Sequence, residues 1–159
     1  MELRLIHIFQ EFKKKNIIYM SQYLNFYLSI KDPEFKSSSV EIPNDVPNNY
    51  ISRIFISTPI YDSEFKQKIG YKVSNDYIQQ VSENEYIVTI YSTYYIYGQG
   101  TISWQYSFLN DKPSYYYPVG ILAVSNITST TGTYYGKTGV VSLTAYEDGK
   151  RDVTVGFNF

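Results

Sequence analysis

The sequence predicts an all-β protein, an eight-stranded antiparallel β-barrel with a short N-terminal helix or extension. Short runs of β-branched and aromatic residues recur between turn-forming residues, which is typical of consecutive antiparallel strands. The run 101–109 alternates strictly, with Ile102, Trp104, Tyr106 and Phe108 on one face and polar side chains on the other. No repeat of about 20–50 residues is visible, which argues against propellers and solenoids. A closed barrel therefore fits best, and a β-sandwich of the same strands is the alternative.

The N-terminal segment 1–16 is expected to be an extension, and 17–159 a single β-barrel domain. Within residues 3–15, Leu5, Ile6, Phe9 and Phe12 follow helical spacing and three lysines come next. Lysines favour a helix C-terminus, so this pattern indicates a short amphipathic helix. The alternating run 3–9 keeps a strand as the competing interpretation.

The first strand is expected over 17–30, because aromatic and β-branched residues dominate it and Lys31-Asp32-Pro33 forms a turn signal after it. Residues 32–50 are rich in Ser, Pro and Asn and are expected to form a long loop, a type of segment that often acts as a lid. Seven further strands are expected at 51–58, 68–80, 85–97, 101–109, 119–126, 138–147 and 150–158. A barrel of eight strands is filled by side chains or holds one small ligand.

Charge and composition argue against several kinds of partner. The chain has 14 basic and 15 acidic residues, a net charge of -1, so nothing attracts it to nucleic acid or to anionic lipid. No apolar run approaches the ~20 residues of a membrane span, and no secretory signal is visible. We expect no nucleic-acid and no membrane partner. The abundant Tyr, Ile, Asn and Lys fit AT-rich coding DNA, such as that of a large DNA virus, a protist or an AT-rich bacterium, and we expect a cytoplasmic or virion-associated protein that is not secreted.

The residues that several kinds of catalytic and metal site require are missing from this sequence. With no cysteine, the chain has no disulfide, no thiolate metal site and no cysteine nucleophile. Its one histidine, His7, cannot alone build a catalytic triad or an imidazole zinc site. The glycine motifs that cradle nucleotide phosphates are missing. We therefore expect no cofactor and no metal, and assign no catalytic residue.

Separated segments in a fixed order carry a family resemblance. They are Ser57-Thr-Pro-Ile-Tyr-Asp62, Lys68-Ile-Gly70, Gly120-Ile-Leu-Ala-Val-Ser125 and the glycine-punctuated stretch Thr130–Leu143. Together they resemble the allene oxide cyclase and dirigent-like barrel family over roughly 51–159. The resemblance implies the barrel fold, and it implies a homotrimer because family members are commonly trimers.

The resemblance also implies where a ligand would lie. Family cyclases fold a fatty-acid epoxide inside the barrel with a glutamate and polar side chains, but the matching positions here do not retain those groups. The positions that would line the lumen are Ile54, Ile56, Thr58, Asp76, Ile87 and Ile121. A carboxylate such as Asp76 is costly inside a barrel unless it is paired, and a register shift of one residue would instead turn it to water.

The dirigent branch of the family uses aspartates and an arginine around its pocket, and no convincing match is visible here. Arg53 precedes a lining position and is expected to point outward. Arg151 lies at a predicted turn between Asp148 and Asp152, where a surface ion pair is expected.

Two functions follow from these observations. The first is a non-catalytic oligomeric barrel that acts as a structural or protein-interaction module through tyrosines near strand ends, namely Tyr94, Tyr95, Tyr97, Tyr115, Tyr116 and Tyr117. The alternative is a binder, or an isomerase or cyclase of the allene oxide cyclase type, for a small apolar molecule. Such a molecule would be fatty-acid-like or polyketide-like, held in the lumen with 32–50 as a lid.

Overall fold

A computed structural model describes residues 23–42, 50–62, 66–113, 120 and 122–158. The strands are β1 (Tyr23–Ser29), β2 (Lys36–Glu41), β3 (Tyr50–Tyr61), β4 (Lys68–Ser82), β5 (Glu85–Ile96), β6 (Gly100–Asn110), β7 (Leu122–Thr130), β8 (Gly139–Ala145) and β9 (Lys150–Phe157). One short 3₁₀ helix, η2 (Gly132–Tyr134), follows β7. No helix within these residues is long and apolar enough to cross a membrane.

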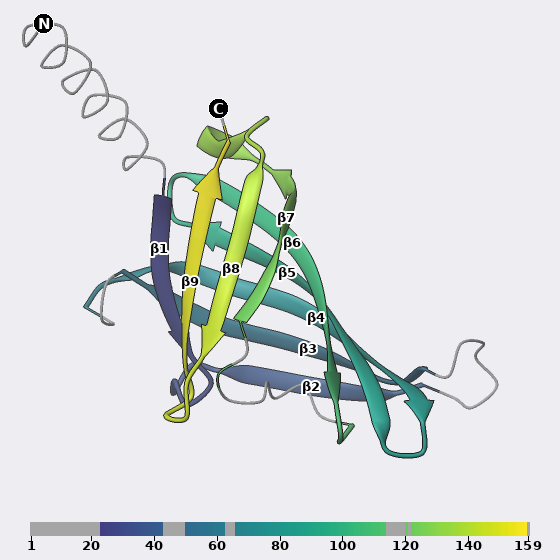
Figure 1. Ribbon diagram of the computed structural model, residues 1–159. Coiled ribbons are helices and arrows are strands. Elements are labelled where there is room, and N and C mark those ends of the chain that lie inside the picture. The colour runs from purple at the N-terminus through teal and green to yellow at the C-terminus, as the bar shows by residue number, and fades with distance from the viewer. Residues whose placement is uncertain (1–22, 43–49, 63–65, 114–119, 121, 159) are drawn as a thin grey trace, which may run out of the picture.

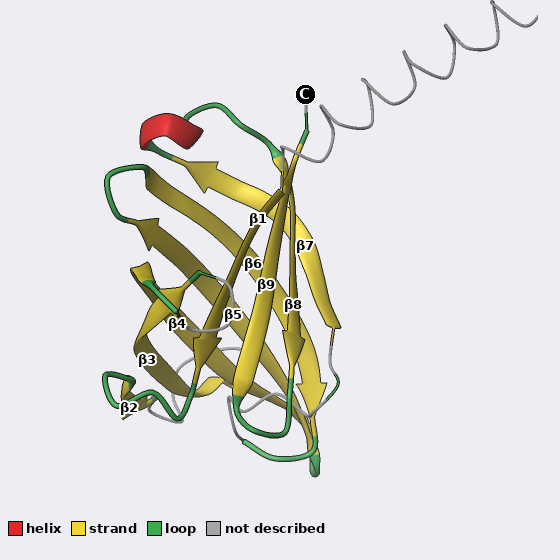
Figure 2. Cartoon of the chain, turned by 90° about the vertical axis from the view of Figure 1, so that its left-hand side faces the viewer, coloured by secondary structure: helices red, strands yellow, loops and turns green. Residues whose placement is uncertain are grey.

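All strands pair antiparallel in the order β1-β9-β8-β7-β6-β5-β4-β3-β2 (Figure 1). The sheet closes because β1 also pairs with β3, where Tyr27 lies opposite Tyr61. The ring therefore has eight strands, with β2 outside it on β3. Figures 1 and 2 show β1, β8 and β9 crossing the long strands β3–β6 on the opposite side of the barrel.

The closed eight-stranded barrel confirms the predicted fold class. Most strand positions agree within a few residues; the largest shift is in β7, expected at 119–126 and found at Leu122–Thr130. The expected helix in 3–15 and the start of the first strand, 17–22, lie outside the described residues.

The prediction of one loop over 32–50 was wrong, because β2 lies within it. Its six residues, KSSSVE, are all exposed and pair with β3 from Lys36 opposite Ser57 to Glu41 opposite Ser52. Sequence patterns detect strands by their buried face, and β2 buries none. Backbone hydrogen bonding to β3 accounts for this strand. Residues 43–49 of the expected loop lie outside the described residues.

The core is the barrel interior. As alternation in 101–109 predicted, Ile102, Trp104 and Tyr106 are buried. Trp104 stacks on Tyr106 with ring centroids 4.1 Å apart, and its centroid lies 6.5 Å from that of Tyr94. Phe26, from β1, meets the Tyr94 ring edge-on at 4.7 Å. Aromatic rings thus join opposite sides of the barrel.

A close glycine contact holds η2 beside the start of β6. The Thr133 N–H donates to the Gln99 carbonyl at 2.7 Å, so η2 lies directly against the turn between β5 and β6. Gly132 has a φ of +64°, and a Cβ there would lie 2.2 Å from that carbonyl oxygen. Only glycine fits both constraints.

Gly132→Ala is expected to destabilise the barrel more than Gly136→Ala. Gly136 also has positive φ, at +74°, but a Cβ there meets nothing within 4 Å. Its replacement should cost only the strain of a left-handed alanine, about 1–2 kcal/mol. Gly132→Ala adds the backbone clash. Urea unfolding midpoints measure both, and equal midpoints would contradict this account.

Candidate functional site

Strand β4 places polar side chains inside the barrel. Lys72, Ser74 and Asp76 occupy alternate positions, so all three face the interior, and Lys72 and Asp76 are only 4% and 1% exposed. Their cross-strand neighbours extend the polar band, since Thr58 lies opposite Lys72 and Ser92 opposite Ser74. Both neighbours are buried.

Asp76 is a buried carboxyl whose two oxygens have no hydrogen-bond partner among the described residues. Burial raises its pKa, and the nearby Lys72 and Ser74 oppose only part of that rise. Burial lowers the pKa of Lys72, Asp76 opposes this, and Arg151 adds to the lowering. No salt bridge within 4 Å joins Lys72 to Asp76. Each group is therefore displaced toward its neutral form.

Arg151 also belongs to the interior, which corrects the expected surface ion pair. Its guanidinium donates to the backbone carbonyls of Lys150, at 2.9 Å, and Tyr146, at 3.4 Å. Alternation along β9 turns Arg151 inward with Val153 and turns Asp152 outward. The surface ion pair is instead Lys150 Nζ to Asp152 Oδ1, at 3.2 Å.

Neutral polar atoms lie in the same interior. The Ser74 and Ser92 hydroxyls, the Tyr94 hydroxyl and Trp104 Nε1 are buried without a hydrogen-bond partner among the described residues. Burial raises the pKa of Tyr94. Buried polar groups in native proteins are nearly always hydrogen-bonded, so these unsatisfied atoms are candidates to bind a polar group of a ligand or water.

The residues predicted to line the lumen are placed as follows. Ile54, Ile56, Thr58 and Asp76 are buried on inner strand faces. Ile87 is half-buried on the outer face of β5, because Val88 and Ile90 take the inner positions, so the prediction for it was wrong. Ile121 lies outside the described residues.

Lys72, Ser74 and Ser92 are interior residues that the sequence did not predict, and Arg151 was expected at the surface. Once Asp76 was considered a lining residue, strict alternation would have added Ser74 and Lys72 at two and four positions before it. Tyr94, expected near the surface, is fully buried. Tyr94 and Tyr95 alternate, so only one of them can face water.

Comparisons with known proteins identify the fold. No family model matches the sequence, and no curated protein matches it. Among solved structures, a pyocyanin demethylase is similar with a TM-score of 0.60 and 11% identity, over 86% of this chain and 99% of that one. A pterocarpan synthase dirigent protein is similar with a TM-score of 0.51 and 16% identity, over 86% of this chain and 84% of that one. Both are allene oxide cyclase/dirigent-like eight-stranded barrels, so the predicted resemblance is confirmed for the fold.

Asp76→Asn is expected to raise stability near pH 7. The raised pKa means that the folded protein keeps a proton that the unfolded chain releases above pH 3.8, so stability falls as pH rises from there through the folded-state pKa. Asparagine has nearly the shape of aspartate but no carboxyl to ionise, so it avoids this loss of stability. The stability gained by Asp76→Asn should therefore vanish at about pH 3. Thermal melts across pH, with the exposed Asp111→Asn as control, measure this. A less stable Asp76→Asn variant at pH 7 would contradict it.

Proposed function

We propose that the barrel interior binds a small, largely apolar molecule that carries one polar group, and that the protein is a binder or an isomerase of such a molecule. The observation that supports this is the burial of Lys72 and Asp76 without a salt bridge between them. Burying ionisable groups unpaired costs stability, and strongly perturbed groups cluster at functional sites. Such a pair is hard to explain in a purely structural core.

The interior offers two kinds of surface to a ligand. Isoleucine, valine and aromatic side chains such as Phe26 and Trp104 suit an apolar body, while the β4 side chains suit a polar end. A protonated Asp76 can give a proton to a bound molecule, and a neutral Lys72 can take one from another atom of it. Moving a proton between two atoms of one molecule is an isomerisation. This extends the sequence-based alternative and assigns the proton transfers to residues other than those of the family cyclases.

The similar structures agree with this proposal at the level of fold. One is named for demethylating pyocyanin and the other for synthesising pterocarpan, so proteins with this barrel act on small organic molecules. Their low identity means that neither substrate carries over to this chain.

Ile56→Trp is expected to abolish lumen binding while the barrel still folds, because Ile56 is buried on the inner face of β3 and the larger indole would compete with a ligand for that position. Native mass spectrometry detects a retained molecule, and the neutral dye N-phenyl-1-naphthylamine reports apolar binding by fluorescence. Ile87→Trp is the matched control, since Ile87 faces outward.

Two outcomes would contradict lumen binding. One is a folded wild-type protein that retains no molecule and does not enhance the dye. The other is dye binding that Ile56→Trp and Ile87→Trp weaken equally. Circular dichroism and melting temperature establish that both variants are folded.

A second candidate is the protein-interaction module, assembled as a homotrimer as the family resemblance implies. The observation in its favour is an outward cluster of Tyr71, Tyr95 and Tyr97. Tyr95 and Tyr97 are 47% and 44% exposed, and their ring centroids are 5.8 Å apart. Exposed aromatic clusters are typical of interface centres. Tyr115–Tyr117, also expected to contribute, lie outside the described residues.

Replacing both Tyr95 and Tyr97 with serine is expected to shift a trimer toward monomer, because two aromatic contacts per subunit are lost. Native mass spectrometry over a dilution series measures this. Tyr91→Ser is the control, because Tyr91 lies on the same face of β5 with equal exposure but outside the cluster. A monomeric wild type, or an unchanged trimer in the double variant, would contradict this candidate.

A further inference from the structure

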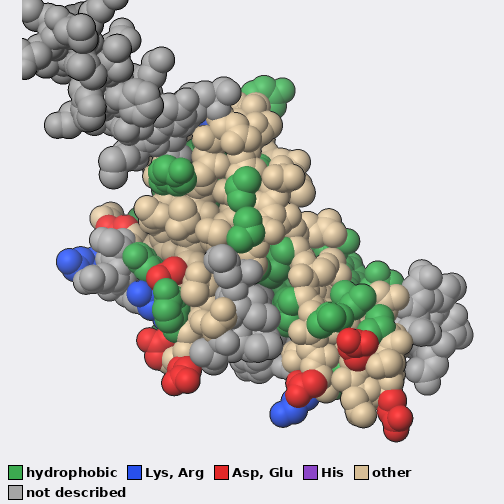
Figure 3. All heavy atoms as spheres, viewed as in Figure 1, with side chains coloured by type: hydrophobic (Ala, Val, Ile, Leu, Met, Phe, Trp, Pro, Cys, Tyr) green, Lys and Arg blue, Asp and Glu red, His purple; other side chains and the backbone are tan. Residues whose placement is uncertain are grey.

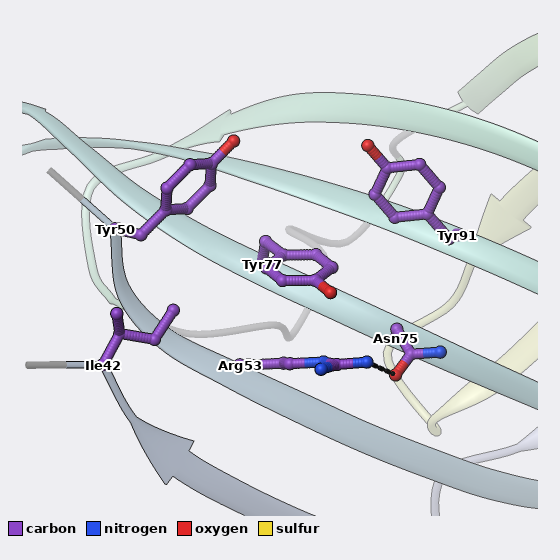
Figure 4. A pocket seen from close by; sticks show the side chains of 6 residues that line it. All are labelled: Ile42, Tyr50, Arg53, Asn75, Tyr77 and Tyr91. Atoms are coloured by element: carbon purple, nitrogen blue, oxygen red, sulfur yellow. Dashed lines mark hydrogen bonds between the residues drawn. The ribbon is translucent and has the colours of Figure 1, made fainter. Parts of the chain in front are cut away.

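The outer faces of β3, β4 and β5 form a second concave site. It is a groove of about 430 Å³ lined by Ile42, Tyr50, Arg53, Asn75, Tyr77 and Tyr91 (Figure 4). This volume lies in the range of small-molecule sites, roughly 300–1,000 Å³. The lining side chains alternate with interior ones along each strand, so the groove is separated from the lumen by the sheet itself.

Among the described residues that line the groove, Arg53 is the only charged one, and none of the described carboxylates pairs with it. No carboxylate among the described residues lies within 4 Å of it. One Nη2–H donates to Asn75 Oδ1 at 3.0 Å, and the buried Nε has no hydrogen-bond partner in the described part of the chain. The guanidinium lies 4.5 Å from the centroid of Phe55 and 5.3 Å from that of Tyr77. Two aromatic rings thus lie against the guanidinium, and its Nη1 end remains to meet an anion.

Three tyrosines supply apolar surface beside this charge. Tyr77 lies between Tyr50 and Tyr91, with ring centroids 5.9 and 5.8 Å away and nearly perpendicular planes. Figure 4 shows the hydroxyls of Tyr50 and Tyr91 pointing toward the same side. Perpendicular rings accept a further flat ring by edge-to-face or stacked contact. On the face seen in Figure 3, the visible charged side chains lie along the left-hand side and the lower part of the molecule.

We propose that this groove binds a small planar aromatic carboxylate, with the carboxylate on the edge of Arg53 and the ring against the tyrosines. Arginine pairs with a carboxylate through two parallel N–H bonds, and the unmatched charge selects an anion over a neutral molecule. The site goes beyond the lumen proposal, because it is on the outside of the barrel and takes a different class of ligand.

Isothermal titration with 2-naphthoate tests the proposal, and 2-naphthalenemethanol serves as the matched neutral probe. Arg53→Gln should weaken naphthoate binding by at least about tenfold, since charge-assisted hydrogen bonds are lost. The naphthoate affinity of Arg53→Lys should lie between those of wild type and Arg53→Gln, because lysine keeps the charge but lacks the planar guanidinium. The alcohol should bind more weakly and be insensitive to Arg53→Gln. Lys137→Gln is the control, because Lys137 Nζ also lies beside aromatic rings, 5.1 Å from Phe157.

Two further variants keep the test independent of the lumen and of misfolding. Naphthoate binding should survive Ile56→Trp, which alters the lumen. It should weaken in Tyr91→Ala but not in Tyr95→Ala, two tyrosines of equal exposure on one strand face. Equal affinity of wild type and a folded Arg53→Gln variant would overturn the proposal, as would loss of binding in Ile56→Trp alone or no binding to wild type.

Discussion

Barrel closure is the constraint on which every site in this protein depends. The pairing of β1 with β3, fixed where Tyr27 lies opposite Tyr61, decides which face of each strand is inside. The Tyr61 hydroxyl also donates to Asp32 Oδ2 at 2.9 Å, which ties the turn after β1 to the same place. Along β4, Ser74 and Asp76 then face the lumen while Asn75 and Tyr77 face the outer groove. One strand therefore lines both proposed sites, and a one-residue slip would exchange the residues that face them.

The electrostatics of the interior follow from the unequal hydrogen bonding of Lys72, Asp76 and Arg151. Arg151 donates to two backbone carbonyls, so its charge is stabilised where it lies. That fixed positive charge lowers the pKa of Lys72 further than burial alone does. Asp76 has no such donors, and burial raises its pKa. The arrangement stabilises the charge of Arg151 and shifts the amine of Lys72 and the carboxyl of Asp76 toward their neutral forms.

Sequence patterns predicted the parts of this fold that bury one clear face. The run 101–109 shows a strict apolar–polar alternation, and β6 has the predicted inward residues. Strand β2 was not predicted, because all six of its side chains are exposed and only backbone hydrogen bonds define it. Ile87 and Arg151 were misplaced for a related reason: an isoleucine next to Val88, and an arginine next to a turn, each suit either face locally. Only pairing with neighbouring strands decides their direction.

Proton linkage would connect the interior groups to the ligand that we propose for the lumen. A ligand that presents a hydrogen-bond acceptor to Asp76 stabilises the protonated carboxyl and raises its pKa still further. A ligand that presents a cation or a donor stabilises the carboxylate and lowers that pKa. Affinity then falls with rising pH in the first case and increases in the second, by the same linkage that governs stability. If the proposed ligand binds, the pH dependence of its affinity would identify which of its chemical groups lies against β4, even before the ligand itself is identified.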